Sequence, residues 1–260
     1  MPTEMEDYLF DLRGFLVLRN AVTPEHIDEM NTLVDGMLPV EPDEWKGHIH
    51  CHRSEDLASI TFRQVFEAGE PFERLIDQPS WINHIRRYVG GDDGLFIDQG
   101  WYNLRGPGGG SSLHSGAHKR RIRTQFRYHE GEFRCGQVNI LLALNDIGPD
   151  DGPTMVVPGS HKSNRLHPAF ERKDSSLDNT EEAIKAPLNA GDALLFVDCI
   201  AHGSAERKTE GYRRALVYRY GPHWGHSRYG YEPSGALLER LTPERRKIIQ
   251  PIPPRRPPDQ

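Results

Sequence analysis

Two helices are predicted in the N-terminal third of the chain, where apolar residues recur at helical spacing. Thr23-Pro24-Glu25 has the residue types of an N-cap, a first helical position and an acidic first turn. The apolar residues after it fall on one helix face, and Pro39 ends the pattern; they are Ile27, Met30, Leu33, Val34 and Met37. A second helix is expected across residues 79–89, ended by Gly90-Gly91.

From Leu95 onward the pattern changes to short β-type runs separated by turn residues. The predicted strands are Leu95–Tyr102, Gln137–Leu144, Thr154–Val157, Ala193–Val197 and Arg214–Tyr220. A further run, Gly14–Leu18, precedes the first helix. Short strands punctuated in this way predict a mainly β fold, a sandwich or barrel with helices outside it.

Composition narrows the class of protein. The 260 residues, 36% hydrophobic and 27% charged, suit one globular domain over residues 1–250, followed by a Pro-rich tail at 251–260. The net charge of −6 argues against a nucleic-acid binder, and no apolar run is long enough to cross a bilayer. The acidic N-terminus lacks the features of a secretory signal, so a cytoplasmic protein is expected. The oligomeric state is left open.

The candidate chemistry lies in a histidine, His202, followed eleven residues later by Arg213. Two antiparallel strands joined by a turn can bring such a pair to one end of a barrel, where the imidazole holds a metal and the guanidinium binds a carboxylate. Arg214 is adjacent, but on a strand it faces the opposite side. His114, which follows a glycine-rich loop at residues 103–112, is a second candidate ligand.

Four segments together resemble the phytanoyl-CoA dioxygenase (PhyH) family. They are Asp11–Leu18, the run from Leu142 through Pro158-Gly-Ser-His161 to Lys162, Ala190–Phe196, and His202-Gly-Ser204 with Arg213 at the family's spacing. The resemblance implies a double-stranded β-helix (a jelly roll, cupin-like) and an oxygenase that uses Fe(II) and 2-oxoglutarate. It places metal ligands at His114 and His202. It places 2-oxoglutarate contacts at Arg213, Ser204, Tyr102 and Asn103.

One position departs from the family pattern. The family's third ligand, an acid two residues after the first histidine, is replaced here by Gly116. Three outcomes remain open. Iron binds through two histidines with water or chloride in the vacant position, as in related radical halogenases; or His118 or Glu130 substitutes; or metal binding is weak or lost, leaving a non-catalytic 2-oxoglutarate or small-molecule binding protein.

The substrate is not identified by the sequence. A small organic molecule and O2 are the partners that the resemblance implies, and the basic stretch at residues 119–127 makes an anionic substrate one option. Gln137 and Asn139 are two residues apart on an apolar strand, so their side chains are expected to line a cavity. Loops at residues 40–66, 117–134 and 221–231 are expected to set specificity.

Overall fold

The computed structural model describes residues 1–53, 59–90, 94–115, 124–172, 176–223 and 232–250. Its helices are α1 (Glu4–Arg13), α2 (Pro24–Asp35), α3 (Glu70–Glu73), α4 (Ile82–Val89), α5 (Gly235–Arg240) and α6 (Pro243–Ile249). Within the described ranges, short 3-10 helices accompany them: η1 (Val65–Ala68), η2 (Arg74–Asp77), η6 (Ser160–Lys162) and η7 (Pro168–Glu171).

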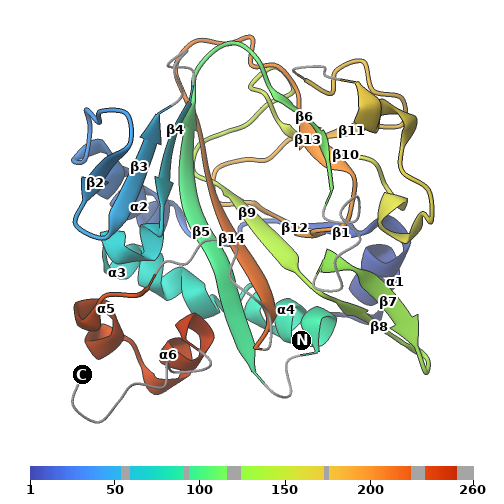
Figure 1. Cartoon of the computed structure of the whole chain (residues 1–260), viewed down its shortest axis with the longest axis horizontal. Coiled ribbons are helices and arrows are strands. Elements are labelled where there is room, and N and C mark those ends of the chain that lie inside the picture. The colour runs from blue at the N-terminus through green and yellow to red at the C-terminus, as the bar shows by residue number, and fades with distance from the viewer. Residues whose placement is uncertain (54–58, 91–93, 116–123, 173–175, 224–231, 251–260) are drawn as a thin grey trace.

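Two antiparallel sheets face each other and form the jelly roll (Figure 1). The large sheet has the order β1 (Phe15–Leu18), β12 (Ala193–Val197), β9 (Val138–Ala143), β14 (Arg213–Pro222), β5 (Leu95–Arg105), β4 (Ser59–Arg63), β3 (Ile49–Arg53) and β2 (Glu44–Lys46). The small sheet has the order β11 (Ile184–Ala186), β10 (Thr154–Val156), β13 (His202–Ser204) and β6 (Ser111–His114). A hairpin of β7 (Phe126–His129) and β8 (Glu132–Cys135) stands beside them.

Helices α2, α3 and α4 cover the outer face of the large sheet (Figure 1). The contacts that join these layers come from alternate residues of the two longest strands. Tyr102 on β5 donates a hydrogen bond to Asn31 of α2 at 2.8 Å, and Tyr218 on β14 donates to the backbone carbonyl of Phe72 in α3 at 2.8 Å. The residues that alternate with Tyr102 on β5 and with Tyr218 on β14 therefore face the opposite way, into the space between the sheets.

The pairing of β14 with β5 places four inward residue pairs in a row. Arg213 lies opposite Arg105, and the next three pairs, in order along the strands, are Ala215–Asn103, Val217–Trp101 and Arg219–Gln99. The register then shifts by one residue at a bulge that contains Asp98. The row is polar at both ends and apolar in its middle.

The predicted strands agree closely with the observed ones, and Ala193–Val197 has the same bounds. The segment at residues 40–66, expected to be a loop, instead contains β2, β3 and β4 in its described part. The tail at 251–260 lies outside the described residues. In the described part of the chain, no helix is both long and apolar enough to cross a membrane.

Candidate active site

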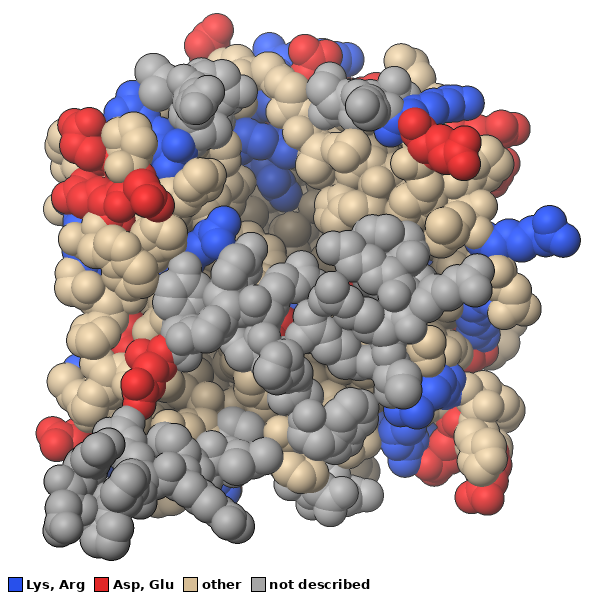
Figure 2. Space-filling model, in the orientation of Figure 1, with Lys and Arg blue, Asp and Glu red and all other residues tan. Residues whose placement is uncertain are grey.

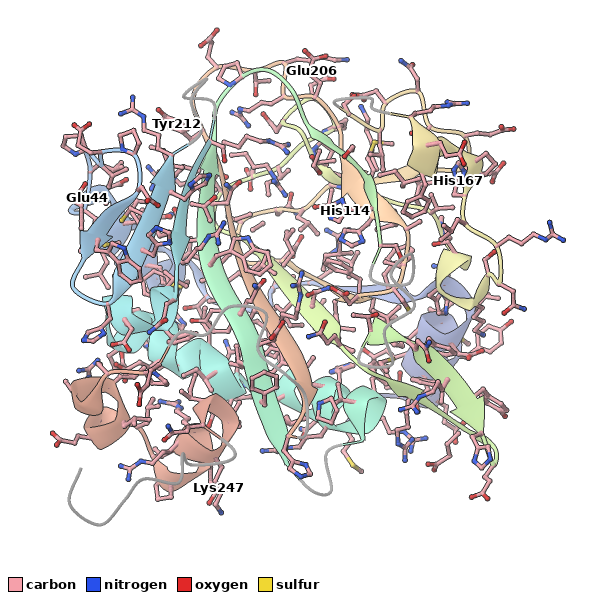
Figure 3. The ribbon with its side chains drawn as sticks, in the orientation of Figure 1. Glu44, His114, His167, Glu206, Tyr212 and Lys247 are labelled. Atoms are coloured by element: carbon pink, nitrogen blue, oxygen red, sulfur yellow. The ribbon has the colours of Figure 1, made fainter. Side chains whose placement is uncertain are left out.

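His114 and His202 face each other across the paired strands β6 and β13. The two residues are register partners, and their ring centroids are 4.2 Å apart. His114, labelled in Figure 3, is exposed to the cavity between the sheets. His202 is only 8% exposed. The chain thus brings together two imidazoles that are 88 positions apart in the sequence (202 − 114).

Each imidazole is held in the same way by a carbonyl two residues earlier in the chain. Nδ1 of His114 lies 2.8 Å from the oxygen of Ser112, and Nδ1 of His202 lies 2.8 Å from the oxygen of Ile200. A carbonyl only accepts, so Nδ1 carries the proton in both rings and the lone pair is on Nε2. Backbone carbonyls orient metal-binding histidines in this way.

The environment of His202 keeps its ring neutral. Burial, together with the neighbouring His114, lowers the pKa of His202 to about 3. A neutral imidazole is the form that binds metal, so the ring is ready to act as a ligand at physiological pH.

Two glycines allow these strands to approach so closely. A Cβ at Gly203 would lie 2.6 Å from the carbonyl oxygen of Ser111 and 2.9 Å from that of Ser112. A Cβ at Gly110 would lie 2.7 Å from the oxygen of Ala205. A side chain at either position would push β6 away from β13.

The same cavity contains a concentration of buried positive charge. Its volume is about 370 Å³, and both histidines line it together with Arg105, Arg213 and Ser204. Figure 2 shows a hollow in this face of the molecule with lysine and arginine side chains near its rim.

Arg213 and Arg105 are both less than 10% exposed, and neither forms an ion pair with a carboxylate of the described residues. Arg213 donates to the hydroxyl of Thr154 at 3.2 Å, while Arg105 donates to Ser204 Oγ at 2.6 Å and to the backbone carbonyl of Gly152. In both guanidinium groups Nε is buried and has no partner. Such donors favour an anion that enters the cavity.

Burial and mutual repulsion destabilise these cations. Burial lowers the pKa of Arg213 to about 9, with Arg105 and Arg207 adding to the effect. Burial also lowers the pKa of Arg105 to about 10, again with a contribution from Arg207. Both values lie above neutral pH, so both side chains remain charged there.

Some of the predicted site residues line this cavity, and others do not. Asn103 and Asn139 line it, in addition to His114, His202, Ser204 and Arg213. Tyr102 does not, contrary to the prediction, because alternation along β5 turns it toward α2 on the outer face. Gln137 is buried beside Asp98, to which it donates at 3.1 Å, and it does not line this cavity.

The candidates for a third metal ligand have different positions. Glu130 is at the turn of the β7–β8 hairpin with 85% of its side chain exposed, so the structure does not bring it to the histidines. Gly116 and His118 lie outside the described residues. Among the residues that are described, no group of three His, Cys, Asp or Glu side chains is placed to hold a metal.

Arg105 is the site residue that sequence reasoning missed. It ends β5 immediately before the glycine-rich loop, opposite Arg213. The signal was present, since Asn103 and Arg105 are two residues apart and therefore share a strand face. Arg214 faces outward as predicted and forms an ion pair with Asp35 at 2.7 Å.

Comparison with solved structures agrees with the fold. The structure is similar to that of HygX from Streptomyces hygroscopicus with nickel and 2-oxoglutarate bound, at a TM-score of 0.69 and 23% identity over 91% of this chain and 94% of that one. It is also similar to the epimerase SnoN in complex with Fe3+, alpha ketoglutarate and nogalamycin RO, at a TM-score of 0.63 and 15% identity over 92% and 90% of the two chains. These two likenesses concern the fold.

Sequence comparison identifies the family. Dioxygenase cdmD of Talaromyces verruculosus is 27% identical over 95% of this chain and 84% of its own length. Dioxygenase andF of Emericella variicolor is 26% identical over 95% and 85%. The family model for phytanoyl-CoA dioxygenase (PhyH) matches residues 10–215. This chain therefore belongs to the phytanoyl-CoA dioxygenase family of oxygenases.

Proposed function

We propose that this protein is an Fe(II)- and 2-oxoglutarate-dependent oxygenase that oxidises a small organic substrate. The observation that carries the proposal is the shared cavity: two oriented imidazoles lie beside two buried arginines that have no carboxylate partner among the described residues. Iron with 2-oxoglutarate, when bound, supplies the activation of O2 that oxidation of a C–H bond requires.

The residues present fit these cofactors in part. Nε2 of His114 and Nε2 of His202 would hold the metal, and the keto acid would add its own chelating oxygens. Arg213 and Arg105 would bind the remote carboxylate of 2-oxoglutarate, since their unpartnered Nε groups need an acceptor. Ser204, already bonded to Arg105, would contribute its hydroxyl.

Apolar side chains form part of the cavity wall. Val217, Leu141 and Phe196 line it, and the ring centroid of Phe196 is 5.0 Å from that of His202. An apolar wall strengthens the attraction between buried arginines and a bound anion, because it lowers the local dielectric constant. It also keeps solvent from the reacting part of the substrate.

Halogenation is a second candidate, favoured by one specific observation. The family's acid is replaced by Gly116, and no carboxylate of the described residues joins the histidine pair. A halide can occupy the position that a carboxylate would otherwise take. Hydroxylation and halogenation then differ in their need for chloride.

The proposal is tested by anaerobic titration of Fe(II) into the protein with 2-oxoglutarate, followed by the charge-transfer absorption of the chelate. We expect a band in wild-type protein and its loss in His114→Ala and His202→Ala. A band that forms only with chloride favours the halogenase. Absence of a band both with and without chloride, while 2-oxoglutarate still binds, contradicts the oxygenase and identifies a binding protein.

A further inference from the structure

A second cavity lies next to the candidate active site. Its volume is about 340 Å³, and residues of β4, β5, η1 and the C-terminal segment line it. Trp101 and Arg219 line both cavities, so the two spaces meet at these side chains. A molecule in the second cavity would reach toward the histidines past Trp101 and Arg219.

The cavity axis is longer than 2-oxoglutarate needs. From Arg213 to Arg219 strand β14 makes six residue-to-residue steps, or about 20 Å at the usual rise per residue. The buried arginines are at one end of this axis and the pair Gln99–Arg219 is at the other. A five-carbon diacid bound to the arginines would leave the Gln99 end available to a second molecule.

Two glutamines line this second cavity, each with one amide atom left without a partner. Gln64 is 4% exposed, and its Nε2 donates to Glu67 Oε1 and to the Glu232 carbonyl, both at 3.4 Å. Because both partners only accept, the amide orientation is defined, and Oε1 is the buried atom without a partner. Gln99 is oriented the other way: Arg219 donates to its Oε1 at 3.0 Å, and its Nε2 is buried without a partner.

These amides offer one acceptor and one donor, which is the complement of a hydroxyl group that donates to Gln64 Oε1 and accepts from Gln99 Nε2. Gln64 has a φ of 59°, a left-handed conformation that a glutamine adopts only at a cost in free energy. Buried amide atoms without partners also cost free energy unless a ligand satisfies them. The left-handed backbone of Gln64 and the unpartnered amide atoms therefore both belong to residues that line this cavity.

The rest of the wall is aromatic. Phe66, Phe96 and Trp101 line the cavity, and the guanidinium of Arg219 lies 5.3 Å from the centroid of the Trp101 ring. Gly100 allows Phe66 to approach β5, since a Cβ there would lie 2.9 Å from the Phe66 ring. Aromatic walls of this kind accept the faces and edges of a ring-shaped molecule.

The charge of this cavity differs from that of the arginine end. Arg219 forms an ion pair with Asp198 at 3.2 Å and donates to Asn139 at 2.9 Å, so a protein carboxylate already compensates it. A second carboxylate, that of Asp98, lines the same cavity. An anionic substrate would gain less here than at Arg213 and would meet a buried acid.

We infer that the second cavity is the substrate cavity, and that it takes an uncharged, ring-containing molecule whose hydroxyl group binds between Gln64 and Gln99. This inference rests on the proposed function, because it assigns the molecule to be oxidised at the histidine pair. It makes Gln64, Gln99 and Trp101 residues that determine substrate specificity.

The test uses 2-naphthol as an uncharged hydroxylated ring probe and 2-naphthoate as its anionic counterpart. Binding to the full-length chain with 2-oxoglutarate present is measured by NMR titration of the probe signals. We expect 2-naphthol to bind at least tenfold more tightly than 2-naphthoate. Gln64→Leu and Gln99→Leu are each expected to weaken 2-naphthol binding about tenfold.

Gln78→Leu is the matched control, since Gln78 bonds to the Ala21 carbonyl and lines neither cavity. It is expected to leave binding of the probe unchanged. The affinity for 2-oxoglutarate should change less than twofold in all three variants. Where a variant does not fold, shifts of the Gln64 and Gln99 side-chain amide protons on adding 2-naphthol to wild-type protein give the same information.

The inference is overturned if 2-naphthol fails to bind, binds no more tightly than 2-naphthoate, or binds equally well to the Gln64 and Gln99 variants. None of these results affects the proposed function, which fails only if the metal and 2-oxoglutarate do not bind together at the histidine pair. Binding of the probe thus tests the substrate cavity, and the charge-transfer band tests the metal site.

Discussion

Arg213 on β14 lies directly across from Arg105 on β5, and neither forms an ion pair with a carboxylate of the described residues. Like charges placed opposite each other in a sheet destabilise it, and burial makes the repulsion stronger. A dianion bound between them would remove this cost. The arrangement thus indicates a site whose stability depends on its ligand.

The first prediction separates Arg213 from its neighbour Arg214. Arg213→Ala removes a charged donor from the cavity and should weaken 2-oxoglutarate binding by about 2 to 3 kcal/mol, or roughly 30- to 150-fold. Arg214→Ala is the control, because Arg214 faces outward and pairs with Asp35. Titration calorimetry measures both; equal losses in the two variants would contradict the assignment.

The second prediction concerns pH. The pKa of Arg213 without ligand is lowered to about 9, mainly by burial, and a bound anion would raise it again. Binding therefore favours the protonated form: affinity for 2-oxoglutarate is full below about pH 9 and is lost as pH rises through that value. Calorimetry between neutral pH and pH 10 should show a flat region followed by a decline. An affinity that rises in this range would be inconsistent with an arginine site.

The third prediction addresses the close approach of β6 and β13. In Gly203→Ala the new Cβ would press on the carbonyl of Ser112, which orients His114. We expect metal affinity to fall at least tenfold, because moving one ligand by a fraction of an ångström disrupts a two-histidine site. Gly235→Ala, where a Cβ meets nothing within 4 Å, is the control. Unchanged metal binding in Gly203→Ala would show that the pair does not hold the ion.

The fourth prediction tests the packing of the helices on the large sheet. The Tyr220 hydroxyl lies 3.1 Å from the carbonyl oxygens of Leu75 and Ile76 and accepts a hydrogen bond from Trp81 Nε1 at 3.2 Å. Tyr220→Phe leaves these buried groups without that partner and should lower the free energy of unfolding by about 1 to 3 kcal/mol. Denaturant unfolding measures the loss, and 2-oxoglutarate binding should persist in the folded variant.

The β-strands of the core could be predicted because their apolar runs are bounded by turn residues. The segment at residues 40–66 is expected from the sequence to be a loop, although β3 alternates buried residues with His50 and His52 as a half-buried strand does. The pairing of β4 with β5, about 40 residues later, is a long-range effect that local sequence does not reveal. Likewise, adjacent residues such as Tyr102 and Asn103 cannot both face inward, and only the register decides which one does.

The histidine pair could be predicted from the family resemblance, but the second cavity could not. Gln64 and Gln99 are 35 positions apart (99 − 64), and nothing in their local sequence indicates that they line one space. Gly116 and His118, the positions at which the sequence leaves the third metal ligand open, lie outside the described residues. Gly116→Asp would raise iron affinity if position 116 faces the metal.

The central claim is that His114 and His202 bind one metal ion through Nε2 while each Nδ1–H donates to a backbone carbonyl. Proton NMR of the protein loaded with Co(II) tests this directly, because the ion shifts the Nδ1–H resonances of its histidine ligands far from the diamagnetic range. We predict two such exchangeable signals in wild-type protein and the loss of both in His114→Ala and in His202→Ala, because one imidazole alone does not hold the ion. A spectrum with no shifted imidazole proton, or with signals that survive both substitutions, would contradict the account.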